Sequence, residues 1–240
     1  MKAKLNGIEI EYQDGGLGSP VLLGHGYSAT GRMWDGQRAA LGDRYRIVSW
    51  DMRGHGQTES PPDAAQYSAA LTVADMRALL QHCGIEGAVV GGLSLGGYVS
   101  LAFYLAHPEM VRALVICDSG PGYRNAEARA AWNKRAHERA AELEAKGLDV
   151  LAGRSREMRE AMGHHASAQG LAHAARGMLA QEGPKVIVGD QDQPFLAPCE
   201  YMAKKIPGAR LEVIPGAGHS SNLDQPAIFN RVLSDFLQSL

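Results

Sequence analysis

The sequence predicts an α/β fold in which a mostly parallel sheet is covered by helices on both faces. Short, continuously apolar runs such as Val21–Leu23 alternate along the chain with longer segments of helical spacing. Strands that are apolar throughout are typical of parallel sheets buried on both sides. In addition, 29 of the 240 residues are glycine, about 12% against an average of about 7%, which indicates many tight turns.

The individual elements follow from local patterns. Lys4–Gln13 alternates apolar and polar residues, which predicts an amphipathic edge strand or hairpin. Apolar runs predict buried strands at 21–23, 45–50, 88–90, 113–117, 185–188 and 210–214. Segments with apolar residues three or four positions apart predict helices at 68–83, 95–106 and 227–240.

The stretch from about Gly120 to Gly183 interrupts this alternation. It carries no strand signal, is rich in Ala, Arg, Glu and Met, and is divided by glycines into short helical segments. We interpret it as a helical insertion between two strands and not as a separate domain. The predicted division is therefore a core of residues 1–120 and 184–240 with an insertion at 121–183.

Charge and composition exclude several classes of protein. The 24 Lys and Arg residues nearly balance the 26 Asp and Glu residues, and a net charge of −2 is unlike that of a protein built to bind nucleic acid. No apolar run approaches the roughly 18 residues of a membrane span. The first residues, MKAKLNGIEIEY, contain no apolar signal-peptide core. We therefore expect a cytoplasmic protein with neither a nucleic-acid nor a membrane partner.

The G-x-S-x-G motif at 92–96 is the strongest local signal for function. Ser94 lies between a predicted strand and a predicted helix, the setting in which a nucleophilic serine sits on a sharp, strained turn. Glycines are needed beside it because side chains there would collide with neighbouring backbone. The helix that follows points its free N–H groups at an anion. Ser94 is therefore the candidate nucleophile.

A serine nucleophile needs a histidine base and an orienting acid, here in the chain order Ser, Asp, His. His219 is preferred among nine histidines because it lies in a Gly-Ala-Gly-His loop directly after a predicted strand. Asp192 is the preferred acid, because it lies on the loop after another predicted strand. Asp118, at the end of a third strand, is the alternative. Asp190 is expected to support the backbone of its own loop.

Two backbone N–H groups are predicted to hold the oxyanion of the transition state. One belongs to Leu95, the residue after the nucleophile, and the other to Tyr27, in the loop after the strand at 21–23. Losing one such donor typically raises the barrier by about 2.7–4 kcal/mol.

The same loop also matches the dinucleotide fingerprint G-x-G-x-x-A at 24–29, with Asp51 in the place of a ribose-binding acid. We reject this alternative because residues 30–34 are a poor start for the required helix, and because it leaves Ser94 and His219 without a role. The sequence contains no H-E-x-x-H and no paired-cysteine spacing. We expect neither a cofactor nor a metal.

Together these motifs resemble the α/β-hydrolase family over nearly the whole chain. The matching segments are the His25-Gly26 loop, DMRGHG at 51–56, the Ser94 motif, GDQD at 189–192 and Gly218-His219. The sequence is similar to small esterases and to 3-oxoadipate enol-lactonase-like hydrolases. This resemblance implies an eight-stranded, mostly parallel sheet flanked by helices, with residues 121–183 as a helical cap. It also implies that Ser94, Asp192 and His219 form a catalytic triad, and that Arg53 and His55 are structural.

The sequence departs from this pattern where the last cap helix should join the strand that carries the acid. The connection at 177–186 is shorter than in similar proteins. We consider two consequences: a more open pocket, or association of copies into a homo-oligomer through the exposed edge.

The expected activity is hydrolysis of small carboxylic esters or lactones. Ser94 argues against the dehalogenases and epoxide hydrolases of this fold, which carry Asp at that position. Alternatives that keep the same triad are C–C bond hydrolysis and perhydrolysis, and a further alternative is a ligand-binding receptor with slow turnover. The substrate-binding candidates are Trp34, Tyr123 and Trp132, whereas Met158, Met162 and Met178 are expected to pack within the cap. No pair of arginines is identified that would clamp a substrate carboxylate.

Overall fold

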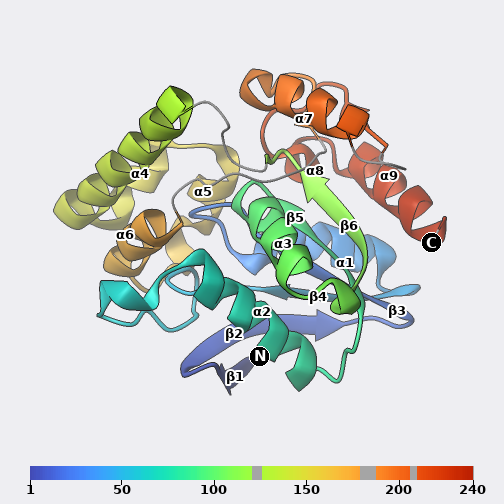
Figure 1. Cartoon of the computed structure of the whole chain (residues 1–240), viewed down its shortest axis with the longest axis horizontal. Helices are drawn as coiled ribbons and strands as arrows, with labels where there is room; N and C mark the ends of the chain where they lie inside the picture. Colours follow the sequence, from blue (N-terminus) through green and yellow to red (C-terminus); the bar gives the residue numbers. More distant parts are fainter. Residues whose placement is uncertain (121–125, 179–187, 206–209, 240) are drawn as a thin grey trace.

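The computed structural model describes residues 1–120, 126–178, 188–205 and 210–239. Within this part of the chain, a central sheet of six strands runs in the spatial order β1–β2–β4–β3–β5–β6 (Figure 1). The strands are β1 (Lys2–Leu5), β2 (Ile8–Gly15), β3 (Ser19–Gly24), β4 (Tyr45–Trp50), β5 (Ala88–Leu93) and β6 (Val111–Cys117). A separate parallel pair is formed by β7 (Val188–Gly189) and β8 (Val213–Ile214).

The sheet is parallel from β4 to β6 and antiparallel at its first two strands. β1 and β2 form the predicted hairpin, and β2 pairs antiparallel with β4. The pairs β3–β4, β3–β5 and β5–β6 are parallel. Their carboxyl ends therefore meet at one edge of the sheet, which is where open α/β sheets bind their ligands.

The helices confirm the predicted segments to within a few residues. They are α1 (Asp35–Leu41), α2 (Ala69–His82), α3 (Leu95–Ala106), α4 (Ala126–Lys146), α5 (Arg156–Ala161), α6 (Ala168–Gly177), α7 (Gln193–Lys205), α8 (Ser221–Asp224) and α9 (Pro226–Gln238). Short 3-10 helices occur at Gly31–Trp34, Ala64–Gln66, Pro108–Met110, Gly147–Gly153 and Met162–His164.

Each central strand contributes side chains to a hydrophobic core on either face of the sheet. In β3, Leu22 packs with α2 and α3 on one face, whereas Val21 and Leu23 pack with α1 and α9 on the other. The alternation arises because successive side chains of a strand point to opposite faces. The two helical layers, visible on either side of the sheet in Figure 1, explain why these strands are apolar throughout.

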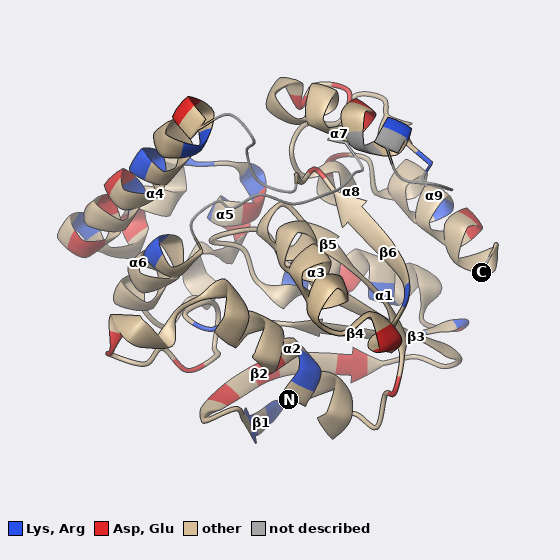
Figure 2. Ribbon diagram, viewed as in Figure 1, with Lys and Arg blue, Asp and Glu red and all other residues tan. Residues whose placement is uncertain are grey.

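Residues 126–177, here named the helical insert, have a small hydrophobic core of their own. Leu143 of α4 packs there with Leu151 and with Leu171 of α6, and α4 and α6 lie side by side (Figure 1). Figure 2 shows charges of both signs along α4, while α3 has no charged residue. The outer surface of the insert therefore faces water, and its apolar side faces inward.

Two predictions about the sheet need correction or stay open. The single eight-stranded sheet that the resemblance implied is wrong for the described residues, whose eight strands form a sheet of six and a separate pair, β7 with β8. One physical reason is that the Gly189 N–H donates to the Asp118 carboxylate at 2.6 Å. This N–H therefore does not pair with the backbone of β6. The shortened connection at 177–186 and most of the strand predicted at 185–188 lie outside the described residues.

Candidate active site

Ser94 occupies a strained turn between β5 and α3. Its backbone has φ 49° and ψ −109°, a region that residues with a side chain rarely adopt. A Cβ added to Gly96 would lie 2.3 Å from the carbonyl oxygen of Gly24, so the glycine is required for the close approach of two backbones. The Ser119 hydroxyl donates to the Ser94 carbonyl at 2.6 Å and helps to hold the turn. The Ser94 side chain is thereby presented at the carboxyl edge of the sheet.

His219 and Asp192 come together from the two loops that follow β8 and β7. The Nδ1–H of His219 donates to Oδ2 of Asp192 at 2.8 Å, and Asp192 is only 6% exposed. Burial alone lowers the pKa of His219, but the hydrogen bond and charge of Asp192 outweigh it, so the pKa is raised. Asp118 and Glu157 add to this increase. Because Nδ1 carries the proton, Nε2 is left as the basic nitrogen.

The other two aspartates that compete for the role of acid have different partners. Asp118 is fully buried and accepts hydrogen bonds from the Gly189 N–H and the Ser221 hydroxyl. Its burial raises its pKa to about 7. Asp190 accepts a hydrogen bond from the Ala217 N–H at 3.3 Å, which fits the predicted support of a loop. Asp192 alone of the three is hydrogen-bonded to His219 in the described part of the chain.

The two predicted oxyanion donors lie beside Ser94. Leu95 is the first residue of α3, and the first N–H groups of a helix have no acceptor within it. Tyr27 follows β3, and its hydroxyl donates to the Leu171 carbonyl of the helical insert at 2.8 Å. Burial raises the pKa of Tyr27 to about 12, so this hydroxyl stays protonated. Both residues line the same cavity as Ser94.

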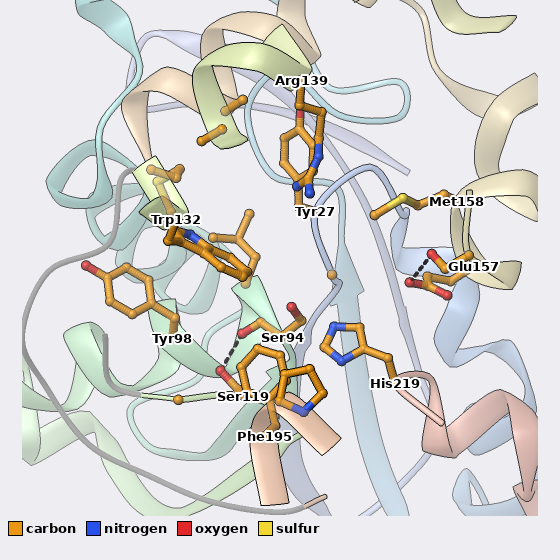
Figure 3. Close-up of a pocket in the computed structure, with 18 of the residues that line it drawn as sticks. Tyr27, Ser94, Tyr98, Ser119, Trp132, Arg139, Glu157, Met158, Phe195 and His219 are labelled. Atoms are coloured by element: carbon orange, nitrogen blue, oxygen red, sulfur yellow. Dashed lines mark hydrogen bonds between the residues drawn. The ribbon is translucent and has the colours of Figure 1, made fainter. Parts of the chain in front are cut away.

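The cavity has a volume of about 390 Å³ and lies between the carboxyl edge of the sheet and the helical insert. Ser94 and His219 both face it, and their side chains point toward each other in Figure 3. Its apolar wall is formed by Tyr98, Trp132, Met158, Met178 and Phe195. This size and lining are typical of sites for small molecules.

The substrate-binding predictions had mixed outcomes. Trp132 lines the cavity, and Tyr123 lies outside the described residues. The prediction for Trp34 is wrong. Its side chain is completely buried and packs against Phe229 in the core beneath the sheet. Its Nε1–H donates a hydrogen bond to the Gly24 carbonyl at 3.2 Å. Its position follows from the 3-10 helix at Gly31–Trp34, which turns the indole away from the cavity and toward α9.

The predictions for the three methionines also had different outcomes. Met158 and Met178 line the cavity, and Met158 and Met162 pack against the small core of the helical insert. The prediction of packing within the cap thus holds for Met162, whereas Met158 takes part in both environments.

Three charged residues of the cavity were not identified from the sequence. Arg139, Arg154 and Glu157 all line it from the helical insert. A signal for Arg139 did exist, because Trp132, Ala136 and Arg139 are spaced four and three positions apart and so share one face of α4. An arginine on the apolar face of a helix is unusual enough to indicate a role.

The predicted structural residues Arg53 and His55 lie in a buried polar layer beneath the cavity. Arg53 forms an ion pair with Asp75 through two hydrogen bonds of 2.7 Å, and both side chains are at most 3% exposed. His55 packs against the rings of His25 and His165, with centroids 4.8 and 6.1 Å away. Burial lowers the pKa of each of these three histidines, which stay neutral.

The described residues contain neither a group of metal-ligating side chains nor a membrane-spanning helix. No group of three or more His, Cys, Asp and Glu side chains in this part of the chain is arranged to hold a metal ion. None of its helices is long and apolar enough to cross a membrane.

Known proteins resemble this chain in both sequence and structure. A protein of Bacillus subtilis named "Putative 2-succinyl-6-hydroxy-2,4-cyclohexadiene-1-carboxylate synthase" is 25% identical over 92% of this chain and 90% of its own length. A thermophilic esterase from Thermogutta terrifontis has a TM-score of 0.85 and 26% identity, covering 100% of this chain and 98% of the esterase. The enol-lactonase from Burkholderia xenovorans has a TM-score of 0.84 and 23% identity, covering 99% and 100%, and shares the fold.

A family model also matches most of the chain. The model of the alpha/beta hydrolase family matches residues 21–232, which include β3, the Ser94 turn and both loops that carry Asp192 and His219. This match confirms the resemblance seen in the sequence and the α/β fold class. The chain therefore belongs to the alpha/beta hydrolase family.

Proposed function

We propose that this protein is a serine hydrolase that cleaves carboxylic esters or lactones through an acyl-enzyme intermediate. The observation that carries the proposal is the meeting of strained Ser94 with the His219–Asp192 pair, joined at 2.8 Å, in one cavity. The esterase from Thermogutta terrifontis and the enol-lactonase from Burkholderia xenovorans support the same class of substrate.

In the first half of the reaction, Oγ of Ser94 attacks the carbonyl carbon of the ester while Nε2 of His219 accepts the serine proton. The charge that develops on the carbonyl oxygen is held by the N–H groups of Tyr27 and Leu95. The tetrahedral intermediate then collapses, and the imidazolium gives its proton to the leaving alcohol oxygen. The acyl group remains on Ser94.

In the second half, a water molecule attacks the acyl carbon, and Nε2 of His219 accepts its proton. Collapse of this second intermediate releases the carboxylic acid and returns the proton to Ser94. Asp192 keeps the proton of His219 on Nδ1 and stabilises the imidazolium in both halves. In this proposal the helical insert acts as a cap, which excludes bulk water from the reacting carbonyl.

The test compares the wild type with Ser94→Ala on short p-nitrophenyl esters. We expect kcat to fall by on the order of 10⁴-fold, because the nucleophile itself is removed. An organophosphonate should label Ser94 of the wild type, located by peptide mass mapping. The same label should persist at Ser94 in Ser119→Ala, which removes a second serine hydroxyl of the cavity wall. Equal activity of Ser94→Ala and wild type would contradict the mechanism.

The alternatives with the same residues predict different results on a substrate panel. A C–C hydrolase would cleave β-diketone-like compounds faster than esters, and a perhydrolase would form peracid from ester and peroxide. A receptor with slow turnover would be acylated stoichiometrically and would not release product. Multiple turnovers on simple esters, at rates above those on β-diketones, support the ester hydrolase.

A further inference from the structure

Arg139 places a positive charge in the wall of the cavity that contains Ser94. It lies on the face of α4 that also carries Trp132 and Ala136, and its side chain is half-buried. The guanidinium carbon is 5.3 Å from the centroid of the Tyr27 ring, a cation–π contact (Figure 3). Burial lowers the pKa of Arg139, which reflects how much water the charge has lost.

The carboxylates near Arg139 are engaged elsewhere. Glu142, one turn further along α4, forms an ion pair with Arg154. Glu157 accepts hydrogen bonds from the Ser155 and Ser220 hydroxyls, one at each of its oxygens. Among the described residues, no carboxylate forms an ion pair with Arg139. A partly desolvated arginine without a carboxylate partner is costly, because most such charges are paired.

Tyr27 fixes the position of this charge relative to the reacting carbonyl. Its backbone N–H is the proposed oxyanion donor, its ring contacts Arg139, and its hydroxyl is tied to the Leu171 carbonyl at 2.8 Å. The guanidinium therefore lies about the length of one tyrosine side chain from the oxyanion site. A flexible acyl chain of a few carbons can span that separation.

The side of the cavity that carries His219 is negative. Glu157 is 3% exposed, and its charge is one of those that raise the pKa of His219. Because His219 must protonate the leaving oxygen, the leaving group lies toward this side. A second carboxylate there would be repelled, whereas one at the far end of the acyl chain would meet Arg139.

We infer that Arg139 is the anchor of an anion-binding subsite, and that the preferred substrate is an ester or lactone whose acyl chain ends in a carboxylate. This inference rests on the proposed function and names its substrate class. Arg139 donates a bidentate pair of hydrogen bonds to the carboxylate, a geometry that a planar guanidinium favours. Arg154, paired with Glu142, adds positive potential at the same end of the cavity.

The test is a comparison of charged and neutral esters of equal length. The mono-p-nitrophenyl esters of succinate, glutarate and adipate are each compared with the neutral p-nitrophenyl ester of the same chain length. In Arg139→Gln, we expect the ratio of kcat/KM for the charged ester to that for the neutral ester to fall roughly 10- to 100-fold. Arg139→Lys should lose only part of this selectivity, since it keeps the charge and loses the bidentate geometry. Lys134→Gln, an exposed change on the same helix, is the matched control and should leave the ratio unchanged.

A second readout does not need turnover. Glutarate should bind to Ser94→Ala in calorimetry, and the heat of binding should disappear in the double variant Ser94→Ala/Arg139→Gln. The melting temperature of each variant checks that it is folded. A selectivity ratio unchanged by Arg139→Gln, together with no glutarate binding, would overturn the subsite while leaving the hydrolase intact. Arg139-dependent glutarate binding by a protein that hydrolyses no ester would uphold the subsite and overturn the proposed function.

Discussion

The turn at Ser94 and the helical insert form two walls of one cavity, but they are specified in different ways. The turn depends on backbone: Gly24 and Gly96 approach so closely that neither has room for a side chain. The insert depends on side chains, because Trp132, Arg139 and Glu157 reach the cavity from α4 and α5, two helices that contain no glycine. In the proposed function, the first wall therefore carries the reacting serine, and the second contacts the substrate.

The largest expected difference between the two walls is in their response to one added methyl group. In Gly96→Ala the new Cβ would lie 2.3 Å from the Gly24 carbonyl oxygen, and we expect a loss of about 4 kcal/mol in the free energy of unfolding. Gly153→Ala in the insert meets nothing within 4 Å, so its effect should stay within about 0.5 kcal/mol. Urea unfolding of both variants measures this, and equal losses would contradict the distinction.

The buried histidines connect the two walls, and we expect acid to destabilise this connection. His25 donates from Nδ1 to the Gly26 carbonyl and accepts the Met52 N–H at Nε2, so both nitrogens are used in the neutral form. Burial lowers the pKa of His25 and of His165, each to about 4. Groups whose pKa is lower in the folded state withhold protons that the unfolded chain binds, so stability is lost as the pH falls from about 6.5 to 4.

For His25 alone this linkage amounts to about 3 kcal/mol, measured as the change in unfolding free energy between pH 7 and pH 4. His219, whose pKa is raised, acts in the opposite direction and offsets part of the loss. His165→Gln should flatten the pH dependence, because it removes one of the buried imidazoles that contact His55. Stability that rises on acidification would contradict the assignment of these histidines as neutral.

The smallest expected effect concerns the contact between the insert and the base. Glu157 is hydrogen-bonded to Ser220, the neighbour of His219, and its charge helps to raise the pKa of His219. Glu157→Gln should therefore move the acidic limb of the kcat/KM profile to lower pH. The exposed Glu160, paired with Arg156 at 2.7 Å, is the control, and Glu160→Gln should leave the limb in place. An unmoved limb in Glu157→Gln would assign that residue a purely packing role.

Sequence reasoning succeeded where local chemistry decides the structure. Ser94 and the hydrogen-bonded pair of His219 and Asp192 could be proposed because each follows a strand in a glycine-rich loop. The fold class followed from apolar strands that alternate with helices. The assignment of Ser94, His219 and Asp192 as a catalytic triad stays a proposal.

Sequence reasoning was less successful where packing between distant segments decides the structure. Trp34 was predicted to bind substrate, but its indole fills the core against Phe229 instead. Arg139 and Glu157 reach the cavity only through the packing of α4 and α5 over the sheet, and no local motif indicates this for Glu157. The division of strands into six and two likewise depends on where the Gly189 N–H finds its acceptor.

The buried carboxylate of Asp118 has a consequence for how the halves of the site stay aligned. Within the described residues, β7 and β8 pair only with each other, so the loops of Asp192 and His219 belong to one unit and Ser94 to another. A small slip between the units would preserve the 2.8 Å bond of the acid–base pair and still carry the imidazole away from the serine. Asp118 connects the two units, since it follows β6 and accepts hydrogen bonds from both Gly189 and Ser221. In the proposed mechanism, Asp118 would therefore hold the candidate base His219 in line with the candidate nucleophile Ser94.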